Sequence, residues 1–275
     1  MGSNPISRPD PLVRLERVSM AYGRGETAVR AVDEVSLEIA KGEFIAVVGP
    51  SGCGKSSLMK LVSGLHPPLS GTLTVEDQPV KGPLKSVGMA FQNSNLLPWR
   101  TALDNVLLPL EIVQPHRSRI RKERQHYRGK ALKLLESVGL GGFTEKFPWQ
   151  LSGGMQQRTS ICRALIHEPE ILMLDEPFGA LDAFTREELW CTMRDLQVAR
   201  NVTVMHVTHD LREAVFLADT VYVMSSRPGR IIRRCEVDIP RPRDLEVTYS
   251  QRFQEIVHEL RALIGRAGDA APEAH

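Results

Sequence analysis

The sequence GPSGCGKS at Gly49–Ser56 follows the apolar run FIAVV at Phe44–Val48 and precedes a stretch with helical spacing at Ser57–Leu65. It matches the pattern G-x-x-x-x-G-K-[S/T] at each fixed position, in the strand–loop–helix setting that the pattern requires. Glycines in such a loop let backbone N–H groups turn inward around phosphate oxygens, and the helix N-terminus adds partial positive charge. The sequence therefore predicts a phosphate-binding loop at the end of a buried strand.

This loop supplies most of the candidate nucleotide contacts. We expect Lys55 to reach the β- and γ-phosphates of ATP and the hydroxyl of Ser56 to bind Mg²⁺. Cys53 lies near the helix N-terminus, which favours a thiolate, so we expect its alkylation to block ATP hydrolysis and bound ATP to protect it. The residues expected to contact nucleotide here are Gly49, Pro50, Ser51, Gly52, Cys53, Gly54, Lys55, Ser56 and Ser57.

A pair of carboxylates follows a second apolar run. The stretch Ile171–Leu174 predicts a strand that delivers Asp175 and Glu176 to the carboxyl edge of the sheet, where ligands of α/β proteins bind. We expect Asp175 to hold Mg²⁺ and Glu176 to act as general base toward the attacking water. A solvated acidic pair at a strand end is the alternative, and the phosphate-binding loop upstream favours the catalytic interpretation.

Further apolar runs predict the rest of the architecture. Runs separated by helical stretches indicate an α/β fold with a largely parallel sheet; they lie at Val87–Phe91, Val202–Val207 and Val221–Met224. Near the N-terminus, Leu15–Val18 and Val35–Ile39 mix apolar with polar residues, which is typical of half-exposed antiparallel strands. The expected fold is a phosphate-loop core with a largely parallel sheet and an N-terminal antiparallel β subdomain.

A helical subdomain is expected to interrupt this core between about residues 96 and 163. Ala102–Ile112 and Ile120–Val138 have helical apolar spacing, and Gly139 is placed to end the second helix in a left-handed conformation. We expect the C-terminal helix, at about 251–264, to pack on this domain or on a second copy. The expected boundaries are a disordered N-terminus at 1–11, one domain at 12–235 and a C-terminal extension at 236–275.

Composition excludes several classes of protein. The chain has 275 residues, of which 35 are basic and 33 acidic, and its net charge of +2 gives no reason to expect a nucleic-acid partner. The four cysteines, Cys53, Cys162, Cys191 and Cys235, form no CxxC pair and predict reduced thiols. No apolar run approaches the roughly 20 residues that cross a bilayer, so we expect a partner to recruit the chain to any membrane.

The sequence LSGGMQQR at Leu151–Arg158 predicts a second anion-binding helix N-terminus, formed by Ser152, Gly153 and Gly154. A chain with one phosphate-binding loop has no use for a second phosphate site unless that site serves the nucleotide of another copy. We therefore expect a head-to-tail homodimer with two shared nucleotide sites.

The combination of GPSGCGKSS, LSGGMQQR and ILMLDEP resembles the signature of the ATP-binding cassette (ABC) family over about residues 12–230. The resemblance implies that Tyr22 stacks on adenine and that His209 contacts the γ-phosphate. It also implies that Gln92 senses Mg²⁺ and the attacking water. The implied catalytic residues are thus Glu176, His209 and Gln92.

The resemblance also assigns cofactors and a coupling loop. Asp182, in the sequence GALD, belongs to the loop that couples the two sites, and Gly179 in that loop departs from the family, which often has serine there. The implied cofactors are ATP and Mg²⁺, with Ser56, Gln92 and Asp175 as the metal ligands.

A function follows from the same resemblance. It implies an ATP-hydrolysing subunit that lies peripherally on the cytoplasmic face of the inner or plasma membrane, bound to transmembrane permease subunits and indirectly to a substrate-binding protein. Leu96–Trp99 (LLPW) and Ser226–Arg230 (SRPGR) are similar to segments of nitrate, sulfonate and taurine importers, so we expect uptake of a small anion. Core packing and a tight turn are the respective alternatives for these two segments.

Two other functions stay open at this stage. A non-transport cassette acting on nucleic acid or ribosomes would carry long coiled coils or a second cassette, and the sequence has neither pattern. A scaffold that binds ATP without turnover would not need a general base, and Glu176 is intact.

Overall fold

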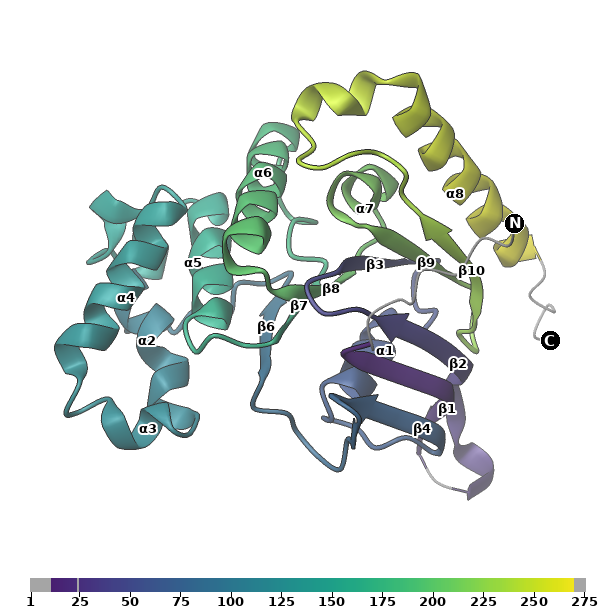
Figure 1. Ribbon diagram of the computed structural model, residues 1–275, viewed down its shortest axis with the longest axis horizontal. Helices are drawn as coiled ribbons and strands as arrows, with labels where there is room; N and C mark the ends of the chain where they lie inside the picture. Colours follow the sequence, from purple (N-terminus) through teal and green to yellow (C-terminus); the bar gives the residue numbers. More distant parts are fainter. Residues whose placement is uncertain (1–10, 24, 270–275) are drawn as a thin grey trace, which may run out of the picture.

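The centre of the molecule is a six-stranded sheet in the order β10-β9-β3-β8-β7-β6 (Figure 1). The computed structural model describes residues 11–23 and 25–269. The strands from β9 to β6 run parallel, and β10 pairs antiparallel with β9. Their bounds are β3 Phe44–Val48, β6 Val87–Phe91, β7 Ile171–Asp175, β8 Thr203–Val207, β9 Thr220–Met224 and β10 Ile231–Glu236. The predicted α/β fold with a largely parallel sheet is confirmed, and the sequence analysis missed β10.

Strand β3 lies inside this sheet, between β9 and β8, and both of its faces are covered. Phe44, Ala46 and Val48 join a hydrophobic core under the helices, whereas Ile45 and Val47 join a second core under the antiparallel strands. All five side chains are fully buried, which is why this strand is a continuous apolar run. The residues that follow it therefore emerge at the centre of the carboxyl edge.

A smaller sheet has the order β2-β1-β4-β5 and is antiparallel throughout. In β2, Val35, Leu37 and Ile39 are buried and alternate with exposed residues, so one face of this strand packs on the core. The strands are β1 Val13–Tyr22, β2 Val29–Ile39, β4 Ser70–Val75 and β5 Gln78–Pro79. The expected N-terminal antiparallel subdomain is confirmed, and helix α1 (Lys55–Val62) contacts strands of both sheets.

The helical subdomain lies at the β6 end of the large sheet, away from the antiparallel sheet (Figure 1). Its helices are α2 Ala102–Ile112, α3 His116–Arg119, α4 Arg124–Ser137 and α5 Gly153–Leu165. Helix α2 begins where the sequence predicts, because the hydroxyl of Thr101 accepts a hydrogen bond from the backbone N–H of Asp104. The inserted helical subdomain is confirmed.

The helix predicted over 120–138 is wrong at its start. Residues up to Arg119 form α3, turns follow to residue 123, and α4 begins at Arg124. Basic residues three or four positions apart repel one another on a helix, which disfavours a continuous helix through Arg121. Gly139 follows α4 with a φ of 76°, the left-handed conformation that the sequence predicts there.

Three more helices cover the sheet on the side of α5: α6 Ala183–Arg200, α7 Leu211–Leu217 and α8 Gln251–Asp269. Helix α8 buries Phe253, Ile256 and Leu260 and contacts α7 and β9, so it packs on its own domain. Buried Arg243, just before α8, donates hydrogen bonds of 2.8 and 2.7 Å to the carbonyl oxygens of Val215 and Ala218. These bonds satisfy carbonyl groups that the end of α7 leaves without helical partners.

Two further expectations concern the N-terminus and the absence of membrane-spanning segments. The disorder expected at 1–11 falls, up to residue 10, outside the described residues. Among the helices formed by residues 11–23 and 25–269, none is long and apolar enough to cross a membrane.

Candidate functional site

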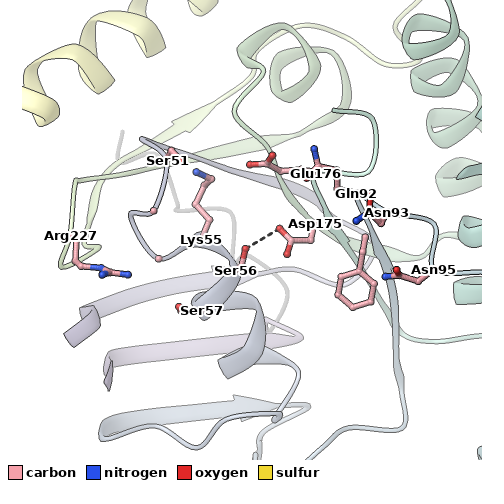
Figure 2. Close-up of a pocket in the computed structure, with 13 residues that line it drawn as sticks. Ser51, Lys55, Ser56, Ser57, Gln92, Asn93, Asn95, Asp175, Glu176 and Arg227 are labelled. Atoms are coloured by element: carbon pink, nitrogen blue, oxygen red, sulfur yellow. Dashed lines mark hydrogen bonds between the residues drawn. The ribbon is translucent and has the colours of Figure 1, made fainter. Parts of the chain in front are cut away.

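A cavity of about 470 Å³ lies at the carboxyl edge of the large sheet, bordered by the loop after β3 and the ends of β6 and β7 (Figure 2). The loop after β9 closes it on one side. Its lining residues are Ser51, Gly52, Gly54, Lys55, Ser56, Ser57, Phe91, Gln92, Asn93, Asn95, Asp175, Glu176 and Arg227. The structure therefore brings the phosphate-binding loop, the carboxylate pair and Gln92 together.

The phosphate-binding loop owes its shape to glycines. Gly54 has a φ of 113°, and a Cβ atom there would lie 2.5 Å from the carbonyl oxygen of Ala31. A Cβ atom on Gly49 would lie 2.8 Å from the carbonyl oxygen of Met224. A side chain at either position would displace backbone, so both glycines are required for the loop to pack against β2 and β9.

Lys55 points along this loop and is 6% exposed. Its ammonium group donates hydrogen bonds of 3.0 Å to the carbonyl oxygens of Gly49 and Pro50. The ammonium is thus held over the inner curve of the loop, where a phosphate oxygen would replace a carbonyl as its partner.

Ser56 and Asp175 form the pair of oxygen ligands that the sequence predicts for Mg²⁺. The hydroxyl of Ser56 donates a hydrogen bond of 3.1 Å to Oδ1 of Asp175, across the cavity between α1 and β7 (Figure 2). Burial raises the pKa of Asp175 above its usual value, and the Ser56 hydrogen bond opposes this shift. Within the described residues, no group of three or more His, Cys, Asp or Glu side chains could hold a metal by itself. Two protein oxygens fit Mg²⁺, which takes its other ligands from phosphates and water.

The two expected catalytic residues Glu176 and His209 are neighbours. Oε2 of Glu176 lies 3.1 Å from Nδ1 of His209, so the ends of β7 and β8 are linked by side chains. Glu176 has a φ of 48°, which is uncommon outside glycine, and its backbone N–H donates to the carbonyl oxygen of Val207 at 2.8 Å.

Gly179 lies beside the same residues. A Cβ atom on Gly179 would be 3.3 Å from Nε2 of Gln92 and 3.8 Å from Cε1 of His209. Gln92 itself lines the cavity after the end of β6. The three predicted catalytic residues therefore converge from the ends of three adjacent strands.

A buried histidine–glutamate pair lies behind His209. His206 in β8 and Glu213 in α7 are 0% and 2% exposed, and they are hydrogen-bonded through Nε2 and Oε1. The pair joins the strand before His209 to the helix after it. It thereby fixes both ends of the segment that carries His209.

Tyr22 lies next to the cavity, as the adenine-stacking role requires. Its hydroxyl is 3.2 Å from the hydroxyl of Ser57, accepts a hydrogen bond of 3.2 Å from the ammonium of Lys60, and the residue is 37% exposed. Burial raises the pKa of Tyr22, but the two hydrogen bonds and the nearby cations together lower it by more, so the net shift is downward. The ring also meets the His66 ring edge-on at 5.5 Å between centroids, and the Lys60 ammonium lies over it at 5.4 Å from the centroid.

The second group of predicted nucleotide contacts lies outside this cavity. Ser152 caps α5 by accepting from the N–H of Met155 at 3.3 Å, and Asp182 caps α6 by accepting from the N–H of Thr185 at 3.0 Å. A Cβ atom on Gly154 would lie 2.5 Å from Cγ2 of Thr185, so the two helix N-termini pack closely. Within one chain, Ser152, Gly153, Gly154 and Asp182 do not line the cavity of Lys55.

The expectation of a reactive thiolate at Cys53 is wrong. Cys53 is 1% exposed, and burial raises the pKa of its thiol despite the opposing charge of Lys55. The side chain points into the core between the loop and β9, near Gly49. The helix N-terminus favours an anion, but burial outweighs this effect because the thiol is removed from water.

Sequence reasoning missed four residues that line the cavity. Asn93 and Asn95 follow Gln92, and Phe91 precedes it, so their position after β6 was a usable signal. Arg227 is the fourth, and it belongs to the segment SRPGR that the sequence analysis treated only as a mark of subfamily or a turn.

Comparison with known proteins agrees with this geometry. A family model described as ABC transporter matches residues 32–179. The aliphatic sulfonates import ATP-binding protein of Bacillus licheniformis is 42% identical over 223 residues, which cover 81% of this chain and 84% of that protein. The taurine import ATP-binding protein of Yersinia pestis bv. Antiqua is 43% identical over 225 residues, which cover 82% of each.

Solved structures give the same result. A dimeric ATP-binding cassette in a post-hydrolysis state, bound to ADP and Pi, has a TM-score of 0.68 and 32% identity, covering 83% of this chain and all of that one. The cbiO1 protein of Clostridium perfringens has a TM-score of 0.73 over 95% of this chain and 98% of that one, and its 24% identity supports the fold alone. The chain therefore belongs to the ABC transporter family, in which it is an ATP-binding and ATP-hydrolysing subunit.

Proposed function

We propose that this chain powers the import of small sulfonates such as taurine, as a homodimer bound to separate transmembrane permease subunits. The observation that carries the ATPase mechanism is the meeting of the Ser56–Asp175 and Glu176–His209 pairs at one sheet edge, 3.1 Å within each pair. The names of the two import relatives support the sulfonate class. Nitrate is the alternative anion of the same importer type.

The residues divide the chemistry between them. Lys55 would bind the β- and γ-phosphates, and Ser56, Asp175 and Gln92 would hold Mg²⁺, which would supply positive charge beside them. Glu176 accepts the proton of the attacking water, and His209 orients Glu176 and donates a hydrogen bond toward the γ-phosphate. Phosphoryl transfer needs mainly positioning and charge stabilisation, and this set supplies both.

The dimer supplies the remaining contacts. Ser152, Gly153 and Gly154 present a helix N-terminus that no phosphate in the same chain's cavity reaches. In a head-to-tail dimer this N-terminus would face the γ-phosphate held by the second copy. A related cassette is dimeric with ADP and Pi, which supports this arrangement.

Location follows from the partners. Import subunits of this type lie on the cytoplasmic face of the inner or plasma membrane, held by the permease, and a substrate-binding protein delivers the sulfonate on the other side. In this assembly the ATPase subunit does not contact the transported molecule. The substrate class therefore has to be tested on the assembled transporter.

The first test compares the ATPase activity of the parent with Glu176→Gln and records the oligomeric state in Mg-ATP. Loss of the general base should lower the turnover rate by at least about 100-fold and leave a dimer trapped with ATP. Glu246→Gln is the matched control, since Glu246 is an exposed acid in the C-terminal extension. Parent-like turnover in Glu176→Gln, or a monomer with bound ATP, would overturn the assignment.

The second test measures transport. The chain is reconstituted in vesicles with its permease and binding protein, and ATP-dependent uptake of taurine is compared with that of nitrate. Taurine uptake that Glu176→Gln abolishes supports the proposal. Uptake of nitrate alone, or copurification with ribosomes in place of a permease, contradicts it.

A further inference from the structure

Arg227 places a cation in the nucleotide cavity that the ATPase mechanism above does not use. It lines the cavity from the loop after β9, and in Figure 2 its guanidinium lies on the side of Ser51 and Ser57, opposite Gln92. Among the residues that the structure describes, no acidic side chain forms an ion pair with it. A cation that lines a phosphate-binding cavity without an acidic partner is suited to an anionic ligand.

The backbone around Arg227 is fixed by β2. The N–H of Gly229 donates to the carbonyl oxygen of Ala31 at 3.0 Å, and the N–H of Asp33 donates to the carbonyl oxygen of Gly229 at 2.9 Å. Asp33 is 2% exposed and also accepts hydrogen bonds from Arg230. The turn that carries Arg227 is therefore anchored on its C-terminal side.

The same turn rests on the phosphate-binding loop. A Cβ atom on Gly229 would lie 2.2 Å from the carbonyl oxygen of Cys53 and 2.5 Å from Cε of Met224. Only glycine allows this approach. The segment SRPGR thus forms one wall of the cavity, and Arg227 is held at a fixed position beside the phosphate-binding loop.

The position of Arg227 relates it to one end of the nucleotide. Glu176, Gln92 and His209 mark the end where the γ-phosphate is hydrolysed, whereas Ser57 and the Tyr22 ring mark the end of the base. Arg227 is on the Ser57 side, and its charge is one of the influences on the Tyr22 hydroxyl. An anion on this side of the loop would be the phosphate nearest the ribose.

We propose that Arg227 is a nucleotide-binding residue that donates hydrogen bonds to the phosphate nearest the ribose of ATP and of ADP. The planar guanidinium can contact two phosphate oxygens at once. Because that phosphate does not change during hydrolysis, the contact is equally strong in substrate and transition state. Such uniform binding affects the KM for ATP and not kcat. This inference rests on the proposed nucleotide site.

The test separates KM from kcat. Arg227→Ala should raise the KM for ATP and the Kd for ADP by about tenfold each, with kcat within about twofold of the parent. Arg227→Lys should recover part of the affinity, since it keeps the charge without the planar fork. Arg233→Ala is the matched control, because Arg233 is an exposed cation in β10 outside the cavity.

Two outcomes would overturn the proposal: unchanged affinity for both nucleotides in Arg227→Ala, or a fall in kcat at constant KM. Thermal unfolding of each variant shows whether the turn is intact, which we expect because Ser225, Gly229 and Arg230 hold it. Lys55→Ala distinguishes failure of the role proposed for Arg227 from failure of the nucleotide site itself. If Lys55→Ala weakens ADP binding and Arg227→Ala does not, only the role of Arg227 fails. If neither weakens it, the nucleotide site itself is misassigned.

Discussion

The cavity of Lys55 and the N-terminus of α5 are the two regions for which we propose phosphate contacts, and one chain encloses only the first. The cavity of Lys55 has walls from the loop after β3, the ends of β6 and β7 and the turn after β9. In it, Lys55 is buried, Asp175 and Glu176 are half-buried, and all three have hydrogen-bond or ion-pair partners. The N-terminus of α5 has no such walls: Ser152 and Gly153 are exposed. Phe184, just after Asp182, is 84% exposed.

From this difference we infer the order in which the proposed complex assembles. The cavity can hold a nucleotide before a second copy arrives, because its loop is shaped by packing against its own β2 and β9. The α5 N-terminus is shaped by its Ser152 cap and by the close approach of Gly154 to Thr185, and in the proposed dimer it would acquire its ligand from the second copy.

Mixed dimers test whether the α5 N-terminus of one copy completes the nucleotide site of the other. They should give the largest change in ATPase activity of the predictions made here. Gly153→Asp places a carboxylate at the α5 N-terminus without a clash, since its Cβ would meet Cδ2 of Leu181 at 3.5 Å. A dimer with Glu176→Gln in one copy and Gly153→Asp in the other keeps one intact shared site, and should retain up to roughly half the activity. A dimer of the parent with a chain that carries both changes has no intact site and should be inactive. ATPase assays of tagged, purified heterodimers measure this.

The reverse pattern would show that each chain completes its own site. In that case the double variant paired with the parent would keep half the activity, and the two single variants together would keep none. Homodimers of each single variant are the controls, and both should be inactive under either arrangement.

The second prediction compares how much the buried His206–Glu213 pair and the Ser152 helix cap each contribute to the free energy of unfolding. His206→Leu leaves Glu213 buried without its partner, and should lower the free energy of unfolding by about 3 kcal/mol. Ser152→Ala removes an exposed helix cap and should lower it by about 1 kcal/mol. Urea unfolding of the purified chain measures both.

Glu213→Gln is the conservative control for that pair, because an amide keeps an acceptor for His206 and should cost less than His206→Leu. Equal losses for His206→Leu and Ser152→Ala would show that the buried pair contributes no more to the segment of His209 than a surface cap contributes to α5.

Sequence patterns predict those parts of the cavity that depend on neighbours along the chain. The loop of Lys55 has fixed spacing after a buried strand, and Asp175 and Glu176 follow another such strand, so elementary α/β topology brings them to one edge. The N-termini of α2 and α5 are likewise local, since Thr101 and Ser152 are recognisable caps.

Features that depend on contacts between distant segments could not be predicted. Arg227 reaches the cavity only because Gly229 pairs with β2, about two hundred residues earlier. The start of α4 depends on the turn around Arg121, where like charges override apolar spacing. The pairing of β10 with β9 lacks a local signal because most of its side chains are exposed.

Cys53 is the sharpest such case, and it gives the prediction with the smallest effect. Burial raises the pKa of all three thiols, but Cys53 is only 1% exposed, so iodoacetamide should modify it more slowly than the half-buried Cys191 and Cys235. Mass spectrometry after labelling at pH 7 should find Cys53 unmodified and the ATPase activity retained, with the labelling rates of all three thiols rising toward pH 9.

Rapid labelling of Cys53 with loss of activity that ATP prevents would instead restore the expectation drawn from the helix N-terminus. The geometry argues against this, because the thiol points toward Gly49 and the core while the backbone of the loop faces the cavity. Since its side chain does not line the cavity, Cys53→Ala should hydrolyse ATP at the rate of the parent.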